Sequence, residues 1–158
     1  MNAAAIDALY RQHGHHVLRR ARRILGNEDD AREVVQDVFE ALLAHGASFR
    51  GESTITTWLY SATTNGCLNK LRNAKTRARL LDARNTHEAT ASADAEVAAI
   101  VRDLLARVPA SLAAIAIHYY ADEMTHEEIA RALGCSRRHV GDLLERLHAC
   151  LRENENLS

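Results

Sequence analysis

The stretch between Asp30 and Asp37 holds the first side chains with a recognisable chemical use. Apolar residues recur through it at helical spacing, so the other positions of a predicted helix point away from its core. Those outward positions carry carboxylates and an amide, which pair with Arg and Lys in polar, separable protein interfaces. The residues that carry these groups are Asp30, Glu33, Gln36 and Asp37. From the sequence alone, a solvated helix face is the favoured interpretation, and a partner-binding surface is the alternative.

A second group of residues combines aromatic rings, an amide and positive charge, which are the groups that bind single-stranded nucleic acid. Phe49 and Arg50 fall in a loop with two glycines. Trp58, Asn65 and Arg72 follow at intervals of seven, near one face of the next predicted helix. An amide such as that of Asn65 can read a base edge. For Phe49 and Trp58, packing in the core is the favoured alternative.

A basic run follows this constellation. Five Lys and Arg residues lie between positions 70 and 79, and no acid occurs from 54 to 81. Such runs often form solvated helix faces, but here the run directly follows the suspected strand-reading residues. We therefore predict phosphate contacts from Lys70, Arg72 and Lys75.

The last fifty residues predict a helix-turn-helix. Thr125 and Glu128 have the spacing of a capping box, and Gly134 with Ser136 marks a tight turn and a new helix start. A plain helical hairpin is the alternative. The predicted DNA-contacting cations of the second helix are Arg137, Arg138, His139 and Arg146. Asp142 and Glu145 interrupt this basic character, so we expect weak, salt-sensitive binding to duplex DNA.

The elements that position these residues are all predicted helices. The sequence has one Pro and seven Gly, and helical periodicity recurs over about 6–25, 28–43, 54–71 and beyond, and from 94 onward. Residues 81–93 lose this period and predict a flexible linker. The expected fold is all-α, with small helical domains at 1–80 and 94–158. The first carries 12 Lys and Arg against 8 acids, the second 7 against 11, which suggests different partners.

Several classes of protein are disfavoured by the sequence. It contains no apolar run long enough to span a membrane and no secretory leader pattern, so a cytoplasmic protein is expected. Three well-separated cysteines suggest reduced thiols. His13, His15 and His16 have no Cys or acid at a usual zinc spacing. No nucleophile motif or phosphate loop is present, so we expect neither an enzyme nor a metal or cofactor site.

Three stretches together resemble the bacterial extracytoplasmic-function (ECF) sigma factors of the sigma-70 family. The first is D-A-R-E-V-V-Q-D-V-F at 30–39. The second combines F-R-G at 49–51, T-W-L-Y at 57–60, Asn65 and L-R at 71–72. The third combines V-P at 108–109, E-I-A at 128–130, L-G at 133–134 and Val140.

This resemblance implies a promoter-specificity subunit. Its first domain would bind core RNA polymerase, with Glu33, Gln36 and Asp37 on the docking helix, and would read the minus-ten element, with the loop at 49–55 capturing an extruded base. Its second domain would read the minus-thirty-five element. The resemblance also implies an anti-sigma partner. The acids at 142 and 145 stand where family members carry cations. A sigma-like adaptor with weak minus-thirty-five recognition, or a helix-turn-helix repressor, therefore remains an alternative.

Overall fold

The first two helices meet at a tight corner whose residues were recognisable in the sequence. The computed structural model describes residues 2–45, 52–80 and 93–155. Helix α1 (Ala3–Leu25) ends at Gly26, whose φ of 67° is a left-handed conformation that glycine adopts without strain. The Asn27 side chain then accepts a 2.9 Å hydrogen bond from the Asp30 backbone at the start of α2 (Glu28–His45). The break between the helices predicted at about 6–25 and 28–43 is confirmed.

Helix α3 (Glu52–Leu80) completes the first half of the molecule as one continuous helix of 29 residues. It extends the predicted helix well past Leu71. The three helices pack around one core of mainly aliphatic side chains, with Leu42 and Leu59 almost fully buried. The predicted stripe of α2 is buried as expected except for Leu43, which is exposed. The first-half core comprises Val17, Ala21, Leu25, Ala31, Val34, Val35, Val38, Phe39, Leu42, Leu59 and Cys67.

The second half begins with two helices separated by the only proline. Helix α4 (Ala93–Arg107) has no buried residue, whereas α5 (Ala110–Ala116) buries four of its seven. Pro109 precedes α5 as its N-cap, and its carbonyl accepts hydrogen bonds from the backbones of Leu112 and Ala113. A π-helical turn, η2 (Ile117–Ala121), continues α5.

The helix-turn-helix is formed by α6 (His126–Leu133) and α7 (Arg137–Glu155). Thr125 accepts from the Glu128 backbone at 3.2 Å, and the Glu128 carboxylate accepts from the Thr125 backbone at 2.7 Å. The Ser136 hydroxyl accepts from the His139 backbone and begins α7. The capping box and the second cap are therefore confirmed. Helices α5, α6 and α7 pack around a second core. Its buried residues are Leu112, Ile115, Ile129, Ala130, Val140, Leu143, Leu144 and Leu147.

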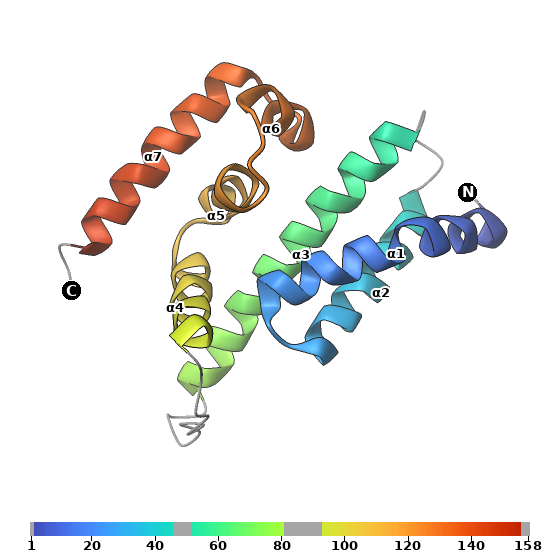
Figure 1. Ribbon diagram of the computed structural model, residues 1–158, viewed down its shortest axis with the longest axis horizontal. Coiled ribbons are helices and arrows are strands. Elements are labelled where there is room, and N and C mark those ends of the chain that lie inside the picture. Colours follow the sequence, from blue (N-terminus) through green and yellow to red (C-terminus); the bar gives the residue numbers. More distant parts are fainter. Residues whose placement is uncertain (1, 46–51, 81–92, 156–158) are drawn as a thin grey trace.

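The two halves pack against each other rather than lying apart. Figure 1 shows α4 beside the C-terminal part of α3, with α5 and α6 further along the same helix and α7 on the outside. A third cluster of buried residues joins the halves: Leu68 of α3 packs with Val108, Ala113, Ala114 and Ile117. Every regular element among the described residues is a helix, so the all-α prediction is confirmed. The predicted linker at 81–93 lies almost wholly outside the described residues.

Candidate functional site

The outward face of α2 presents the predicted acidic and amide groups. Glu33, Gln36 and Asp37 are exposed, and Asp30 is half-buried. The Gln36 side chain donates a 2.9 Å hydrogen bond to Glu40 one turn later. The opposite face of α2 is occupied by the first-half core, so these polar groups contribute no apolar packing. They form a surface with negative charge that a cationic partner can approach.

Glu33 already has a cationic neighbour within the molecule. Its carboxylate forms an ion pair with Lys70 of α3. The hydrogen bond from Lys70 lowers the pKa of Glu33 and raises the pKa of Lys70, so both groups stay charged near neutral pH. This pair links a predicted polymerase-binding residue to a predicted DNA-binding one, a proximity that sequence spacing did not reveal.

The predicted strand-reading residues of α3 have different surroundings. Asn65 is exposed, whereas Trp58 is half-buried and packs against the first-half core, as favoured from the sequence. The Arg72 guanidinium turns to the second half and donates to the Val108 carbonyl at 3.0 Å. Phe49 and Arg50 lie outside the described residues. Asn65 is therefore the member of this group that α3 leaves most accessible.

The basic run of α3 is partly engaged by other parts of the molecule. Besides the contacts of Lys70 and Arg72, the Lys75 ammonium lies 3.3 Å from the Asp103 carboxylate of α4. Arg77 is exposed near the end of the run. Three cations predicted to contact phosphates thus have intramolecular partners in this arrangement of the two halves.

The start of α7 retains its predicted cations on the surface. Arg137, Arg138 and His139 are all exposed, as is Arg146 further along. Asp142 and Glu145 are exposed too, so they contribute negative charge to the same helix. The buried residues of α7 fix it against α5 and α6, which makes this helix a rigid element able to enter a groove of duplex DNA.

A buried polar cluster that sequence reasoning missed lies between the halves. Arg20 of α1 is only 9% exposed. Its guanidinium donates to both carboxylate oxygens of Asp122, at 2.5 and 2.7 Å, and to the Thr64 hydroxyl. Tyr60 places its ring 5.0 Å from the same guanidinium. Local spacing offered one hint, because position 20 falls on the apolar face of α1 with Val17.

Asp122 is held in its charged form by this cluster. Burial alone would raise its pKa, but hydrogen bonds from His118 and Arg20 outweigh burial and lower the pKa to about 2. The His118 ring is fully buried, with Nδ1 3.1 Å from the carboxylate. The cluster therefore combines a buried cation, a buried anion and two polar neighbours from both halves.

A cavity of about 610 Å³ adjoins this cluster. Its apolar lining comes mainly from the second half, including Val101, Leu105 and Leu147. The first half contributes cations, among them the exposed Arg19 and Arg23. This cavity combines an apolar surface with positive charge, which suits a segment that is both apolar and acidic.

The three cysteines are free thiols that differ in burial. Cys67 is buried, and burial raises its pKa to about 12, whereas Cys135 and Cys150 are only half-buried. Across the residues that the structure describes, no three His, Cys, Asp or Glu side chains gather as metal ligands. No helix in the same part of the chain is long and apolar enough to cross a bilayer.

Comparison with known proteins places this architecture in a family. The model of Sigma-70 region 2 matches residues 9–77, which include α2 and most of α3. The ECF RNA polymerase sigma factor SigM of Mycobacterium tuberculosis is 29% identical over 149 residues, covering 93% of this chain and 75% of that protein. The RNA polymerase sigma factor YlaC of Bacillus subtilis is 27% identical over 159 residues, covering 95% and 91%.

Two solved structures share the fold. A chain from the structure of CnrH in complex with the cytosolic domain of CnrY superposes with a TM-score of 0.58 at 22% identity, covering 99% of this chain and 91% of that one. A chain from the complex of sigma factor RpoE with anti-sigma factor NepR of Bartonella quintana gives 0.54 at 18% identity, covering 93% and 94%. Identities this low support the fold alone.

The helical halves, the polar face of α2 and these matches define a promoter-specificity factor of RNA polymerase. The chain is similar over most of its length to RNA polymerase sigma factors of the sigma-70 family, among them an extracytoplasmic-function factor. Members of this family are transcription initiation factors that are not enzymes, and this chain has promoter-specific sigma factor function.

Proposed function

We propose that this chain works in the cytoplasm as a non-enzymatic initiation factor with a division of labour between two domains. The domain at 1–80 binds core RNA polymerase and opens the minus-ten element. The domain at 94–158 binds the minus-thirty-five element, and residues 81–93 link the two. The observation that carries this proposal is the exposed polar face of α2, which lies within the region matched by Sigma-70 region 2.

Core polymerase binds to that face of α2 through charge pairing. Glu33 and Asp37 are exposed on a helix whose other side is fixed in the first-half core, so docking requires no repacking. Gln36 adds an amide, and Asp30 lies at the edge of the face. Pairing between exposed charges sets orientation and association rate and leaves the complex separable.

The minus-ten strand binds along α3. Asn65 is exposed where an extruded base can meet its amide, and Arg77 offers a cation near the end of the basic run. Phe49 and Arg50 contribute the wall and positive charge of the base pocket, with Trp58 bracing the helix from inside the core. Lys70, Arg72 and Lys75 contact phosphates once their present intramolecular partners are displaced.

The minus-thirty-five duplex binds the start of α7. Arg137, Arg138 and His139 occupy the first turn, where a recognition helix reaches bases and phosphates, and Arg146 adds a phosphate contact. The exposed Asp142 and Glu145 weaken this binding by repulsion. They favour the second candidate function, a sigma-like polymerase adaptor in which minus-thirty-five recognition contributes little.

An anti-sigma factor is the proposed regulatory partner. The two structural neighbours come from complexes with the cytosolic domain of CnrY and with the anti-sigma factor NepR. In this chain, the cavity between the halves has an apolar lining with Arg19 and Arg23 at its edge. An amphipathic segment with acidic residues has the matching chemistry, because its apolar side and its charges would both be satisfied there.

Reconstituted transcription tests the proposal. Core polymerase with this chain should initiate at a distinct set of promoters in a genomic promoter library, and core polymerase alone should not. A double variant that carries both Glu33→Lys and Asp37→Lys should bind core polymerase about tenfold more weakly, equivalent to about 1.4 kcal/mol. The reason is that two favourable charge pairs become repulsive.

The matched control is Glu153→Lys with Glu155→Lys, which changes the net charge equally on the exposed end of α7. This control should bind core polymerase normally. Circular dichroism should report the same helicity for both double variants. Equal affinity of the α2 variant and the control would reject the docking face, and an inactive wild-type chain in the library would reject sigma function.

A further inference from the structure

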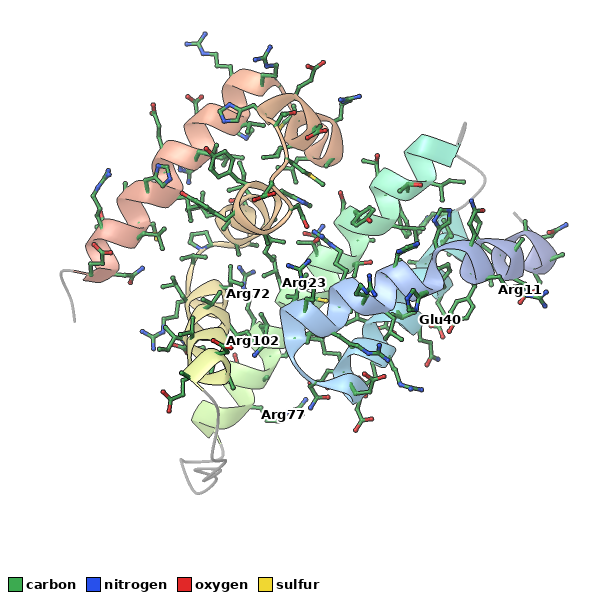
Figure 2. All side chains as sticks on the ribbon, viewed as in Figure 1. Arg11, Arg23, Glu40, Arg72, Arg77 and Arg102 are labelled. Atoms are coloured by element: carbon green, nitrogen blue, oxygen red, sulfur yellow. The ribbon has the colours of Figure 1, made fainter. Side chains whose placement is uncertain are left out.

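Two of the five arginines of α1, Arg19 and Arg23, differ from the other three. Each of the others forms an ion pair with a carboxylate. Within the described part of the chain, Arg19 and Arg23 have no such partner, although both are exposed and both line the cavity of about 610 Å³. They lie one helical turn apart, so both reach the same side of α1. Figure 2 shows Arg23 where α1, α3 and α4 come together, with Arg11 far away near the start of α1.

The cavity has an excess of positive charge. Its lining includes four arginines and one carboxylate, that of Asp122. This carboxylate is already paired, because the Arg20 guanidinium donates to its two oxygens at 2.5 and 2.7 Å. Arg102 donates to the neutral Ile24 carbonyl, which leaves its charge unbalanced. Positive charge beside an apolar wall attracts an anion more strongly than the same charge on an open surface.

The rest of the lining is mainly aliphatic. Val101 and Leu105 of α4 and Leu147 and Leu151 of α7 all contribute to it. Val101 is 48% exposed, so this lining leaves apolar surface in contact with water. A molecule that covers this surface is favoured by the hydrophobic effect. Three of the four arginines belong to α1, so the charge and the aliphatic surface come mainly from different helices.

The size and the chemistry of the cavity together define a class of ligand. A volume of about 610 Å³ is within the roughly 300–1,000 Å³ of small-molecule sites, which combine an apolar lining with a few orienting polar groups. Guanidinium groups present paired N–H donors that match the oxygens of a carboxylate or a phosphate. The aliphatic lining fits a hydrocarbon chain. A ligand with both parts satisfies the charge and the apolar surface at once.

We propose that this cavity is a binding site for a small amphipathic anion, a molecule with one aliphatic chain and one carboxylate or phosphate head. The head binds Arg19 and Arg23, and the chain packs against the aliphatic side chains of α4 and α7. This site goes beyond the proposed function, because it requires neither polymerase nor promoter. The anti-sigma segment proposed above uses the same cavity, so the small ligand and that segment exclude each other.

The first test measures binding of single-chain probes to the full-length protein by isothermal titration calorimetry. Decanoate should bind saturably with one molecule per chain. Octanoate should bind about fifteenfold more weakly, because two fewer CH₂ groups are buried. Butyrate has the head without the chain and decanol has the chain without the charge, so each should bind at least about tenfold more weakly than decanoate. Butyrate that binds as tightly as decanoate would indicate an adventitious ion only and would overturn the site.

The second test removes the two cations. A double variant with Arg19→Gln and Arg23→Gln should bind decanoate at least about tenfold more weakly and should bind decanol as wild type does. The matched control carries Arg11→Gln and Arg32→Gln, which remove the same charge from exposed positions outside the cavity lining. This control should bind decanoate normally. Equal weakening in both double variants would mean general attraction by net charge and would overturn the site.

The third test addresses the aliphatic part of the lining. Val101→Asp places a charge where the chain packs and should weaken decanoate binding at least about tenfold. Val97→Asp is the matched control, because it makes the same change one turn earlier on α4, at a side chain 60% exposed and outside the lining. It should bind as wild type does. Circular dichroism checks that both variants keep their helices, and the arginine pair decides the matter if Val101→Asp does not. Normal binding by a folded Val101→Asp variant would overturn the placement of the chain.

The last probe identifies the head group. Decyl phosphate that binds more tightly than decanoate would indicate a phosphate ligand, and the reverse order would indicate a carboxylate; either order supports the site. Absence of saturable binding by both probes would overturn the proposal. That outcome would leave the sigma function untouched, because reconstituted transcription tests it separately.

Discussion

The first half of this molecule and helix α4 of the second half are stabilised in different ways. The first half buries eleven residues in a single core shared by three long helices. In the second half, α4 buries none of its residues fully and leaves Val97, Ile100 and Val101 exposed. Its packing partner is α3 of the first half. The first half thus has a core of its own, although the second half covers Leu68 and pairs with Arg20, whereas the position of α4 depends on α3.

This difference clarifies the charge asymmetry of the chain. Net positive and net negative halves suggested separate partners, namely polymerase, DNA and regulators. The structure shows that part of the asymmetry is satisfied internally, through Arg20 with Asp122 and Lys75 with Asp103. Opposite charges on two parts of one chain therefore also indicate that those parts can bind each other.

The largest expected effect contrasts the core with α4. Leu42→Ala, at a fully buried site in the first half, should lower the free energy of unfolding by about 3 kcal/mol through lost packing and a cavity. Ile100→Ala, at a residue 67% exposed on α4, should change it by less than about 0.5 kcal/mol. Urea denaturation followed by circular dichroism measures both. Similar losses at the two sites would contradict the comparison.

The next effect concerns the exposed face of α3 in the first half. Asn65→Ala should destabilise open complexes by about 1–3 kcal/mol if the amide reads one base, and should change the preferred base at that position. Permanganate footprinting on promoters with each base substituted measures both effects. Arg77→Ala, further along α3, is a useful comparison because loss of a phosphate contact should weaken all sequences equally. Identical base preference before and after Asn65→Ala would reject its assignment.

The interface between the halves should respond to acid through Asp122. Because its pKa is lowered to about 2, its contribution is present above the ordinary value of 3.8 and is lost as pH falls toward 2. Wild type should therefore melt above Asp122→Asn at pH 6, and the difference should shrink below about pH 4. The groups that face this carboxylate are Arg20 and His118. A difference that persists unchanged at pH 2.5 would contradict this assignment.

The sequence predicted most of the helices because their signals are local. The glycine at 26, the capping box at Thr125 and the stripe of α2 each depend on residues within a few positions. The contact of Arg20 with Asp122 could not be predicted in this way, since the partners are 102 positions apart. Periodicity identifies which side of a helix is buried, but not whether its partner belongs to the same half.

In the candidate site too, exposure could be predicted from the sequence, but tertiary contacts could not. Exposure of Glu33, Asn65 and the first turn of α7 follows from the helical pattern and agrees with the structure. The intramolecular partners of Lys70, Arg72 and Lys75 were not foreseen, because a run of cations reads as free surface when considered alone. Long side chains reach across an interface that only tertiary packing creates.

A smaller effect is expected at the cap of α6 in the second half. Thr125→Ala removes the hydroxyl that accepts from the Glu128 backbone and should reduce the free energy of unfolding by about 1 kcal/mol. Thr125→Ser retains the hydroxyl and should leave stability almost unchanged. Thermal unfolding measures both variants. Equal destabilisation by Ala and Ser would show that the methyl group, rather than the cap, matters here.

The smallest effect concerns the mixed charge of α7, and it tests whether the second half still binds duplex DNA. Its first-turn cations and its later acids are all exposed while the two halves are packed together, so a full-length protein can be used. Asp142→Lys with Glu145→Lys should tighten binding to a promoter duplex only severalfold, because exposed charges contribute roughly 0.2–1 kcal/mol each. Each added phosphate contact should also steepen the dependence of log affinity on log salt by about 0.9. Loss of Arg137 and Arg138 should have the opposite effect on both quantities. Fluorescence anisotropy at several salt concentrations measures them, and salt-independent binding unaffected by either pair would mean that another surface holds the duplex.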